Sequence, residues 1–375
     1  MTNETANKIR VMLVDDSAVI RGFITKILES EPDIAVVASC QNGQVAVSSI
    51  LNAAPDIILL DVEMPIMDGI TAIPLLLQKD PKARIVMCST LTTQNGTTTL
   101  KAMSLGAIDC IAKPSSVQEI YGQDEFKTVL LSKIRLITGS TIRQRTAANA
   151  AADASAPAAT PAVRERAPIH PHLPKVVKLR PANEGWAGKP SIVAIGSSTG
   201  GPNALFKVLK HCAGFDVPIV ITQHMPPTFT KILAEHIQTQ TGIPAFEAAE
   251  NMPLEPGKIY VAQGGVHMLI TSNKTIHLDN GPMENFCRPA VDPMLRSLIP
   301  IYKDRILSVI LTGMGQDGMR GSQDIAKAGG RVLAQNEETS VVWGMPGATA
   351  LAGICSAVLP LEEIGPAIRK AVLRL

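Results

Sequence analysis

Short apolar runs alternate with amphipathic stretches through the first third of the chain. The apolar runs predict five strands, at Ile9–Val14, Ile34–Ser39, Ile57–Leu60, Ile85–Cys88 and Cys110–Ala112. The stretches between them have helical spacing and predict helices at Ala18–Ser30, Gly43–Asn52, Gly69–Gln78 and Thr97–Leu105. Strands that alternate with helices form a parallel sheet covered on both faces. We therefore expect a five-stranded, doubly wound, flavodoxin-like α/β domain.

The C-terminal half repeats this alternation around a group of closely spaced short strands. Its outer elements are predicted as strands at Ser191–Ile195, Val217–Thr222, Ile306–Leu311 and Arg331–Ala334, and as helices at Pro202–Cys212, Pro227–Thr239, Pro293–Pro300 and Gly318–Ala328. The runs Lys258–Val261, His267–Thr271 and Lys274–Leu278 are joined by turns and predict an antiparallel meander. We expect an α/β domain with a mostly parallel sheet and an antiparallel β insertion.

A segment of different composition separates the two patterns. Residues 147–162 are almost entirely Ala, Pro, Ser and Thr, and seven prolines lie between 157 and 190. Such a stretch buries too little apolar surface to offset the entropy of ordering it. The sequence therefore predicts a first domain at 1–139, a flexible linker at 140–188 and a second domain at 189–375.

Composition narrows the classes of protein. The chain has 375 residues, 46% of them hydrophobic and 3% aromatic, so wholesale disorder is excluded. Eight Lys and Arg against three acids give 139–189 a charge of +5, and the whole chain carries only +2; the basic excess belongs to one segment and predicts no nucleic-acid face. The six cysteines have no metal-ligand spacing, and no apolar run is long enough for membrane insertion. We expect a cytoplasmic monomer whose cysteines are reduced.

Charged side chains follow several strands of the first domain. Asp15 and Asp16 follow the first strand and Asp61 the third, while Ser89 and Lys113 follow the fourth and fifth. Carboxyl ends of parallel strands line the crevice where ligands bind. Clustered carboxylates repel unless a cation such as Mg²⁺ lies among them. A single aspartate there is more simply a helix cap, but five such residues at matching strand ends favour a site.

The segments VDDS, LLDVEMPIMDG, CST and AKP resemble those of a response-regulator receiver domain over about residues 8–125. The resemblance implies that Asp61 accepts a phosphoryl group from a chemotaxis histidine kinase. It also implies that Mg²⁺ binds Asp15, Asp16, Asp61 and the backbone carbonyl of Glu63.

The same resemblance implies that Ser89 and Lys113 bind the phosphoryl group and relay its presence. One position departs from the family pattern, because Cys110 stands where many receivers carry an aromatic residue that swings inward on activation. A switch based on that aromatic ring is therefore not expected here.

A glycine-rich turn in the second domain carries a candidate nucleophile. The segment from Gly196 to Gly200 fits the G-x-S-x-G pattern around Ser198, with a predicted strand before it and a helix beginning at Pro202. The helix N-terminus would direct backbone N–H groups toward an oxyanion. The pattern alone is equally compatible with a phosphate-binding turn or a packing turn.

A serine nucleophile needs a base and a group that orients the base. Of the seven histidines, only His224 follows a parallel strand of the second domain. Asp317 lies in the glycine-rich turn after the strand Ile306–Leu311, where it could equally be a plain turn residue. As a third member it would hold the imidazole tautomer. The order Ser–His–Asp differs from that of the α/β-hydrolases, chymotrypsin and subtilisin.

The segments AIGSSTGGP, ITQHMP, LTGMGQDG and VVWGMPGA resemble those of the chemotaxis protein-glutamate methylesterase (CheB) family over about residues 190–372. The resemblance implies Ser198 as nucleophile, His224 as general base and acid, and Asp317 as orienter. It also implies methyl-accepting chemoreceptors as substrates, a glutamine deamidase activity and no cofactor for the esterase reaction. From the local geometry we place the oxyanion at the backbone N–H groups of Thr199 and Met314.

Three other functions remain open at the level of sequence. The second domain could be a protein-interaction module without chemistry, which a serine-directed fluorophosphonate would fail to label. It could hydrolyse small esters instead of receptor esters. A transcription factor is less favoured, because the C-terminal half has neither a compact helix-turn-helix nor a basic face.

Overall fold

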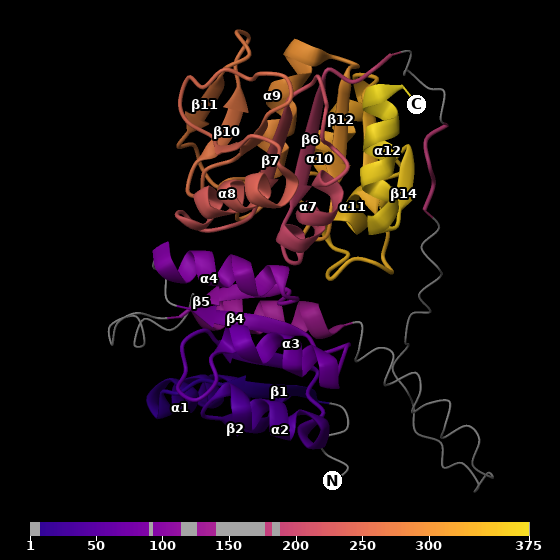
Figure 1. The fold of residues 1–375 in the computed structure, drawn as a ribbon. Helices are drawn as coiled ribbons and strands as arrows, with labels where there is room; N and C mark the ends of the chain where they lie inside the picture. Colours follow the sequence, from indigo (N-terminus) through magenta and orange to yellow (C-terminus); the bar gives the residue numbers. More distant parts are fainter. Residues whose placement is uncertain (1–7, 90–92, 114–125, 140–176, 182–187, 375) are drawn as a thin grey trace, which may run out of the picture.

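The computed structural model describes residues 8–89, 93–113, 126–139, 177–181 and 188–374. These residues form two α/β units, each built on its own sheet (Figure 1). Among the described helices, none is both long and apolar enough to cross a membrane. Most of the predicted linker, 140–188, lies outside the described residues.

The first unit is a parallel sheet in the order β2-β1-β3-β4-β5. Its strands are β1 (Ile9–Val14), β2 (Ile34–Cys40), β3 (Ile57–Asp61), β4 (Ile85–Ser89) and β5 (Asp109–Ala112). Alternate side chains of β1 face opposite layers: Val11 and Leu13 join one buried cluster, and Met12 and Val14 join the other. The expected flavodoxin-like order and two-sided burial are confirmed.

Five helices of this unit lie within the described residues, and side chains cap the first three. They are α1 (Ala18–Glu29), α2 (Gly43–Ala53), α3 (Gly69–Lys79), α4 (Thr93–Ser104) and a last helix over 126–139. Ser17, Asn42 and Asp68 each accept a hydrogen bond from a backbone N–H of the first turn. These caps fix where each helix leaves the carboxyl end of its preceding strand.

The second unit has seven parallel strands in the order β14-β13-β12-β6-β7-β9-β8. The strands are β6 (Ile192–Ser197), β7 (Ile219–Gln223), β8 (Ala245–Glu247), β9 (Ile259–Val261), β12 (Ile306–Ile310), β13 (Arg331–Gln335) and β14 (Ala357–Leu359). An antiparallel pair, β10 (His267–Ile270) with β11 (Ile276–Asp279), forms a separate small sheet. A mostly parallel sheet with an antiparallel insertion is therefore confirmed.

One detail of the predicted meander is wrong. The run Lys258–Val261 becomes β9, which pairs in parallel with β7 and β8 inside the main sheet. Its three residues are buried on both faces of that sheet, a pattern that a short apolar run shares with a hairpin strand. The meander is thus reduced to β10 and β11.

Six helices cover the second sheet. They are α7 (Gly201–Leu209), α8 (Phe229–Thr241), α9 (Val291–Tyr302), α10 (Met319–Lys327), α11 (Met345–Leu351) and α12 (Leu361–Leu373). Side chains of α7, α8 and α12 pack in one buried cluster, and those of α9, α10 and α11 in the other. The chain enters the sheet at the central strand β6 and later returns on its other side at β12. In open α/β sheets such a reversal of strand order is where ligand crevices form, here at the carboxyl ends of β6, β7 and β12.

A short stretch of the predicted linker packs on the second unit. The Arg180 N–H donates to the Cys355 carbonyl at 2.8 Å, and Val177 packs against a buried cluster of that unit. Residues 177–181 therefore associate with the second unit, ahead of the predicted boundary at 189.

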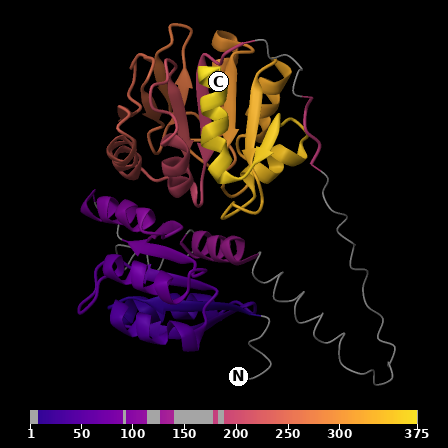
Figure 2. The same cartoon turned by 45° about the vertical axis from the view of Figure 1, so that its right-hand side comes forward.

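The two units contact each other through α4 and β5 of the first (Figures 1 and 2). Leu100 and Met103 of α4 are buried in the hydrophobic cluster built by α7 and α8. Cys110 packs against hydrophobic clusters of both units, so the position that carries an aromatic in many receivers lies at the interface. Three hydrogen bonds join the start of β5 to the start of α7: Gly200 N–H to Ile108 O (3.1 Å), Asn203 Nδ2 to Ala107 O (2.9 Å) and Thr199 Oγ1 to Asp109 Oδ2 (2.8 Å).

Candidate active site

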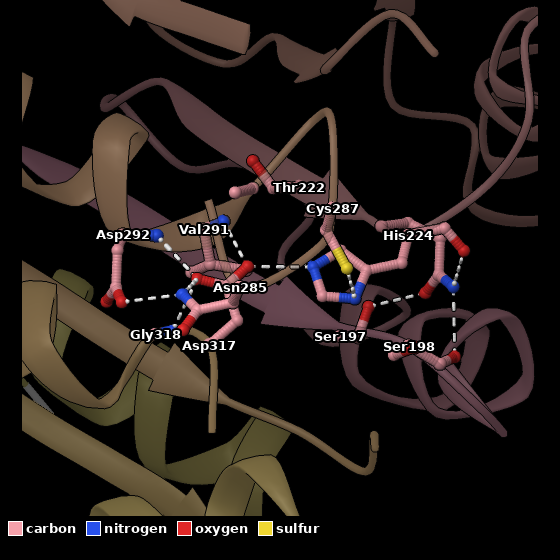
Figure 3. Close-up of polar contacts among 12 residues, drawn as sticks. Ser197, Ser198, Thr222, His224, Asn285, Cys287, Val291, Asp292, Asp317 and Gly318 are labelled. Atoms are coloured by element: carbon pink, nitrogen blue, oxygen red, sulfur yellow. Dashed lines mark hydrogen bonds and ion pairs between the residues drawn. The ribbon is translucent and has the colours of Figure 1, made fainter. Parts of the chain in front are cut away.

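The crevice of the second sheet holds a histidine–aspartate pair. His224 follows β7, and its Nε2 lies 2.8 Å from Oδ2 of Asp317, which stands in the turn between β12 and α10 (Figure 3). The side chain of Asp317 is 1% exposed and that of His224 is 12% exposed. The two strands are separated by β6 alone, so the fold brings together residues 93 positions apart.

Asp317 is held as a carboxylate by an unusually large number of donors. Oδ2 accepts from His224 and from the Val291 N–H (2.6 Å). Oδ1 accepts from the N–H groups of Asp292 (3.0 Å) and Gly318 (2.9 Å). Val291 and Asp292 open α9, where free N–H groups and the helix dipole favour an anion. Burial opposes the charge, but His224 and these donors prevail and lower the pKa of Asp317.

Asp317 consequently orients the imidazole of His224 by occupying one of its two ring nitrogens, Nε2. A carboxylate at Nε2 fixes the proton of neutral His224 there and leaves Nδ1 as the basic nitrogen. Burial of the ring favours its neutral form, yet the hydrogen bonds with Asp317 and Cys287 outweigh burial and raise the pKa of His224 to about 9. The Nδ1 atom lies 3.5 Å from the Cys287 Sγ. Among the described residues, no hydrogen bond joins this nitrogen to the Ser198 hydroxyl.

Ser198 lies directly beyond the end of β6, beside the histidine. The His224 N–H donates to the Ser197 carbonyl at 3.1 Å, which ties the two strand ends together. Gln223 donates from Nε2 to the Ser198 carbonyl (2.9 Å) and accepts at Oε1 from the Ser197 hydroxyl (2.6 Å). The Ser198 side chain is half-buried, and a Cβ on Gly313 would lie 2.8 Å from its Cβ. Glycine at 313 therefore makes room for the serine.

The two amides expected to bind the oxyanion lie at the same edge. The Ser198 N–H donates to the Thr312 carbonyl (3.0 Å), and the Gly200 N–H donates to the Ile108 carbonyl of the first domain. The N–H groups of Thr199 and Met314 donate to no protein acceptor within the described part of the chain. Gly200 has φ +76, a left-handed conformation that suits glycine and directs the chain from the turn into α7.

The first domain has its own charged crevice. Lys113 Nζ lies 2.6 Å from Asp15 Oδ2 and 2.7 Å from Asp61 Oδ1. Burial raises the pKa of Asp61, with Asp15 adding to the effect and Lys113 opposing it. Ser89 ends β4, and its carbonyl accepts from the Lys113 N–H at 2.9 Å. All four residues meet at the carboxyl edge of the sheet, as expected.

This crevice fits a hard divalent cation. Carboxylate oxygens of Asp15, Asp16 and Asp61 lie within 4.8 Å of one another. The buried Oδ2 of Asp15 receives no neutral donor among the described residues. Oxygen donors and uncompensated negative charge are what Mg²⁺ binds. Glu63 lies in the following loop with its side chain exposed, which is compatible with a ligand role for its backbone carbonyl only.

Four residues that contact the histidine–aspartate pair or the serine turn are absent from the sequence predictions: Gln223, Asn285, Cys287 and Asp292. Gln223 precedes His224 within the segment ITQHMP, so its proximity was available as a signal. The other three come from the 284–292 stretch, whose contacts with His224 and Asp317 span 25 to 63 positions. No pattern in the sequence marks those pairings.

Together, a phosphoacceptor-like crevice and a histidine–aspartate crevice define a receiver domain joined to a hydrolase-like domain. Family models for the response regulator receiver domain and the CheB methylesterase match residues 11–123 and 193–368. A protein-glutamate methylesterase/protein-glutamine glutaminase of group 2 operon from Rhodospirillum centenum is 50% identical over 97% of this chain and 94% of its own. The corresponding protein of Azospirillum brasilense is 50% identical over 98% of this chain and 93% of its own.

Among solved structures, the Thermotoga maritima CheB methylesterase catalytic domain is 38% identical, covers 49% of this chain and 99% of its own, and has a TM-score of 0.47. The full-length identity to the curated relatives decides the assignment. The chain belongs to the protein-glutamate methylesterase/protein-glutamine glutaminase family.

Proposed function

We propose that this protein hydrolyses γ-methyl esters of glutamate on methyl-accepting chemoreceptors in the cytoplasm, and deamidates glutamines there, through Ser198, His224 and Asp317. The observation that carries the proposal is the 2.8 Å contact between His224 and Asp317 at the strand ends beside Ser198. That contact supplies a base of defined tautomer on the strand that neighbours Ser198, and acyl transfer needs such a base together with a nucleophilic hydroxyl. Family membership supports the substrate class.

The reaction begins when the Ser198 Oγ attacks the ester carbonyl and Nδ1 of His224 takes its proton. For this the imidazole must exchange its contact with Cys287 for one with Ser198. The N–H groups of Thr199 and Met314 stabilise the tetrahedral oxyanion. The imidazolium gives the proton to the departing methoxide, or to the amide nitrogen of a glutamine, which leaves as ammonia. Water then hydrolyses the acyl-serine with the same base.

The receiver controls access to this chemistry. In the present arrangement Asp109, Ile108 and Ala107 bind the turn and helix that follow Ser198. These contacts restrain the nucleophile turn and cover its edge. A phosphoryl group on Asp61, donated by a chemotaxis histidine kinase, favours an arrangement in which they are released.

Phosphorylation requires the acidic crevice of the receiver. Asp15, Asp16, Asp61 and the Glu63 carbonyl would hold Mg²⁺, which neutralises negative charge on the incoming phosphoryl group. Lys113 already lies between two of these carboxylates and is placed to bind a phosphoryl oxygen. Ser89 at the end of β4 supplies a hydroxyl on the neighbouring strand.

Methanol release from a methylated chemoreceptor tests this function. Protein treated with a small-molecule phosphodonor and Mg²⁺ should release methanol faster than untreated protein, and Ser198→Ala should release none. A fluorophosphonate should label Ser198 in the wild type. Absence of both methanol release and labelling would identify the second domain as a non-catalytic interaction module, and release from small esters alone would reassign the substrate.

A further inference from the structure

A short turn packs against both members of the histidine–aspartate pair, with Asn285 on Asp317 and Cys287 on His224. The Glu284 N–H donates to the Cys287 carbonyl (3.2 Å), and the Cys287 N–H donates to the Glu284 carbonyl (2.9 Å). The two central residues, Asn285 and Phe286, have φ of +53 and +61. Positive φ at both positions is the pattern of a type I′ turn, which Asn adopts readily at its first central position. The turn thus fixes the direction of the Asn285 side chain.

The Asn285 amide bridges two buried carboxylates. Its Nδ2 donates to Asp317 Oδ1 at 2.9 Å and to Asp292 Oδ2 at 3.1 Å (Figure 3). Both protons of the amide nitrogen are then in use. Asp292 and Asp317 are 0% and 1% exposed, so this donor cannot be replaced by solvent. A flipped amide would place its oxygen against both carboxylates, and the orientation is therefore unique.

Asp292 is itself firmly held. Its Oδ1 accepts from the Gly321 N–H at 2.6 Å, and a Cβ on Gly321 would lie 2.7 Å from that of Leu295, so glycine permits the close approach of α10 to α9. Burial, aided by the nearby Asp317, raises the pKa of Asp292 to about 6. At neutral pH the Asn285 amide is consequently a neutral spacer between two negative charges.

We propose that Asn285 is a positioning residue for the hydrolytic reaction, which it serves by bridging Asp292 and Asp317 and so holding Oδ2 of Asp317 toward His224. This inference rests on the proposed Ser–His–Asp function. Asn285 contacts neither the serine nor the oxyanion amides. Its effect passes through Asp317 to the orientation and basicity of the imidazole. The charged groups that face the bridge are Asp292, Asp317 and His224, with Glu284 neighbouring it in the turn and paired to Arg296.

Asn285→Gly separates the effect of the side-chain amide from the effect of the turn conformation. Glycine accepts positive φ without strain, so the variant should keep the turn and lose only the bridge. We expect kcat for methanol release by the phosphorylated full-length protein to fall about 10- to 100-fold with KM unchanged, because the base is misaligned. The matched control is Phe286→Gly, which alters the other positive-φ residue of the turn and removes a side chain that is 98% exposed. It should retain the wild-type rate.

Asn285→Asp tests the hydrogen bond through the pH dependence of activity, which would not change if Asn285 served only to fill space. The new carboxyl faces two others, which raises its pKa, and while protonated it donates one O–H in place of the amide. Its activity relative to the wild type should be higher near about pH 7 than near about pH 9, where the new carboxyl ionises. Asp292 is ionised throughout that range, so Asn285→Gly should show no such dependence on pH.

The results separate the possible failures. A wild-type rate in Asn285→Gly, with Ser198→Ala inactive, would overturn the positioning role and leave the triad standing. Equal losses of kcat in Asn285→Gly and Asn285→Asp at every pH would overturn the claim that the side chain of residue 285 acts as a bridging hydrogen-bond donor. Activity in Ser198→Ala would overturn the proposed function, and this inference with it. Thermal unfolding of each variant establishes that folded proteins are compared.

Discussion

Thr199→Val should raise the activity of the unphosphorylated protein. The Thr199 hydroxyl donates to Asp109 Oδ2 at 2.8 Å across the domain interface, and its side chain is buried there. Valine has nearly the same shape but cannot donate. The substitution therefore weakens the restraining contact, while the backbone N–H of residue 199 remains available for the oxyanion.

The size of the effect depends on the partners that Asp109 retains after the substitution. A hydrogen bond to a charged group contributes about 1.5–3 kcal/mol. Asp109 retains Lys133, whose Nζ lies 2.8 Å from the same oxygen, so its charge is not left unpaired and the lower half of that range applies. A loss of about 1.5–2 kcal/mol raises the open-to-closed ratio about 10- to 30-fold. Basal methanol release should rise by that factor unless the open form becomes dominant first.

The assay compares initial rates of methanol release before and after phosphorylation of Asp61. Thr239→Val on α8, where the threonine is exposed and bonds only within its own helix, is the matched control and should behave as wild type. Phosphorylated Thr199→Val and wild type should have equal rates. If the unphosphorylated variant were no faster than wild type while the phosphorylated rates agreed, the restraining role of this contact would be refuted.

Three further predictions test the site. Asp317→Asn should lower kcat about 10⁴-fold with little change in KM, because an amide does not hold the Nε2–H tautomer; a loss below about tenfold would contradict the orienting role. Since a pKa of about 9 keeps His224 protonated at neutral pH, kcat/KM should rise with pH through the neutral range. Cys287→Ser should move that rise to lower pH by removing a partner that favours the imidazolium. An unchanged pH profile would contradict the effect of the Cys287 sulfur on the pKa of His224. Chelation of Mg²⁺ should abolish activation by the phosphodonor and leave basal methanol release unchanged, as measured in the same assay.

The sequence predicts the receiver sheet well because each of its strands is an isolated apolar run between amphipathic helices. β1 has the bounds that its pattern predicts, and each of the other four strands is one residue longer. Acidic residues at strand ends are also visible in the sequence, since parallel strands place consecutive carboxyl ends at one edge. The same argument predicts that Ser198, His224 and Asp317 lie along a shared edge.

The remaining features depend on contacts that periodicity does not encode. β8 and β14 have three residues each, too few for a recognisable period. The strand β9 has the same apolar character as a hairpin strand, and only its neighbours β7 and β8 make it parallel. The contacts of Asn285 and Cys287 with Asp317 and His224 arise from a turn that presents no motif, and the docking of β5 on α7 joins residues about 90 positions apart.

The account depends most on Ser198 carrying the acyl group, and the acyl-enzyme can be sought directly. Phosphorylated protein would be mixed with a slowly deacylating ester, quenched in acid, digested and analysed by mass spectrometry. We predict an acyl adduct on the peptide containing Ser198, absent in Ser198→Ala and increased in the wild type by phosphorylation. An adduct on Cys287, or methanol release with Ser198 replaced by alanine, would contradict the central claim.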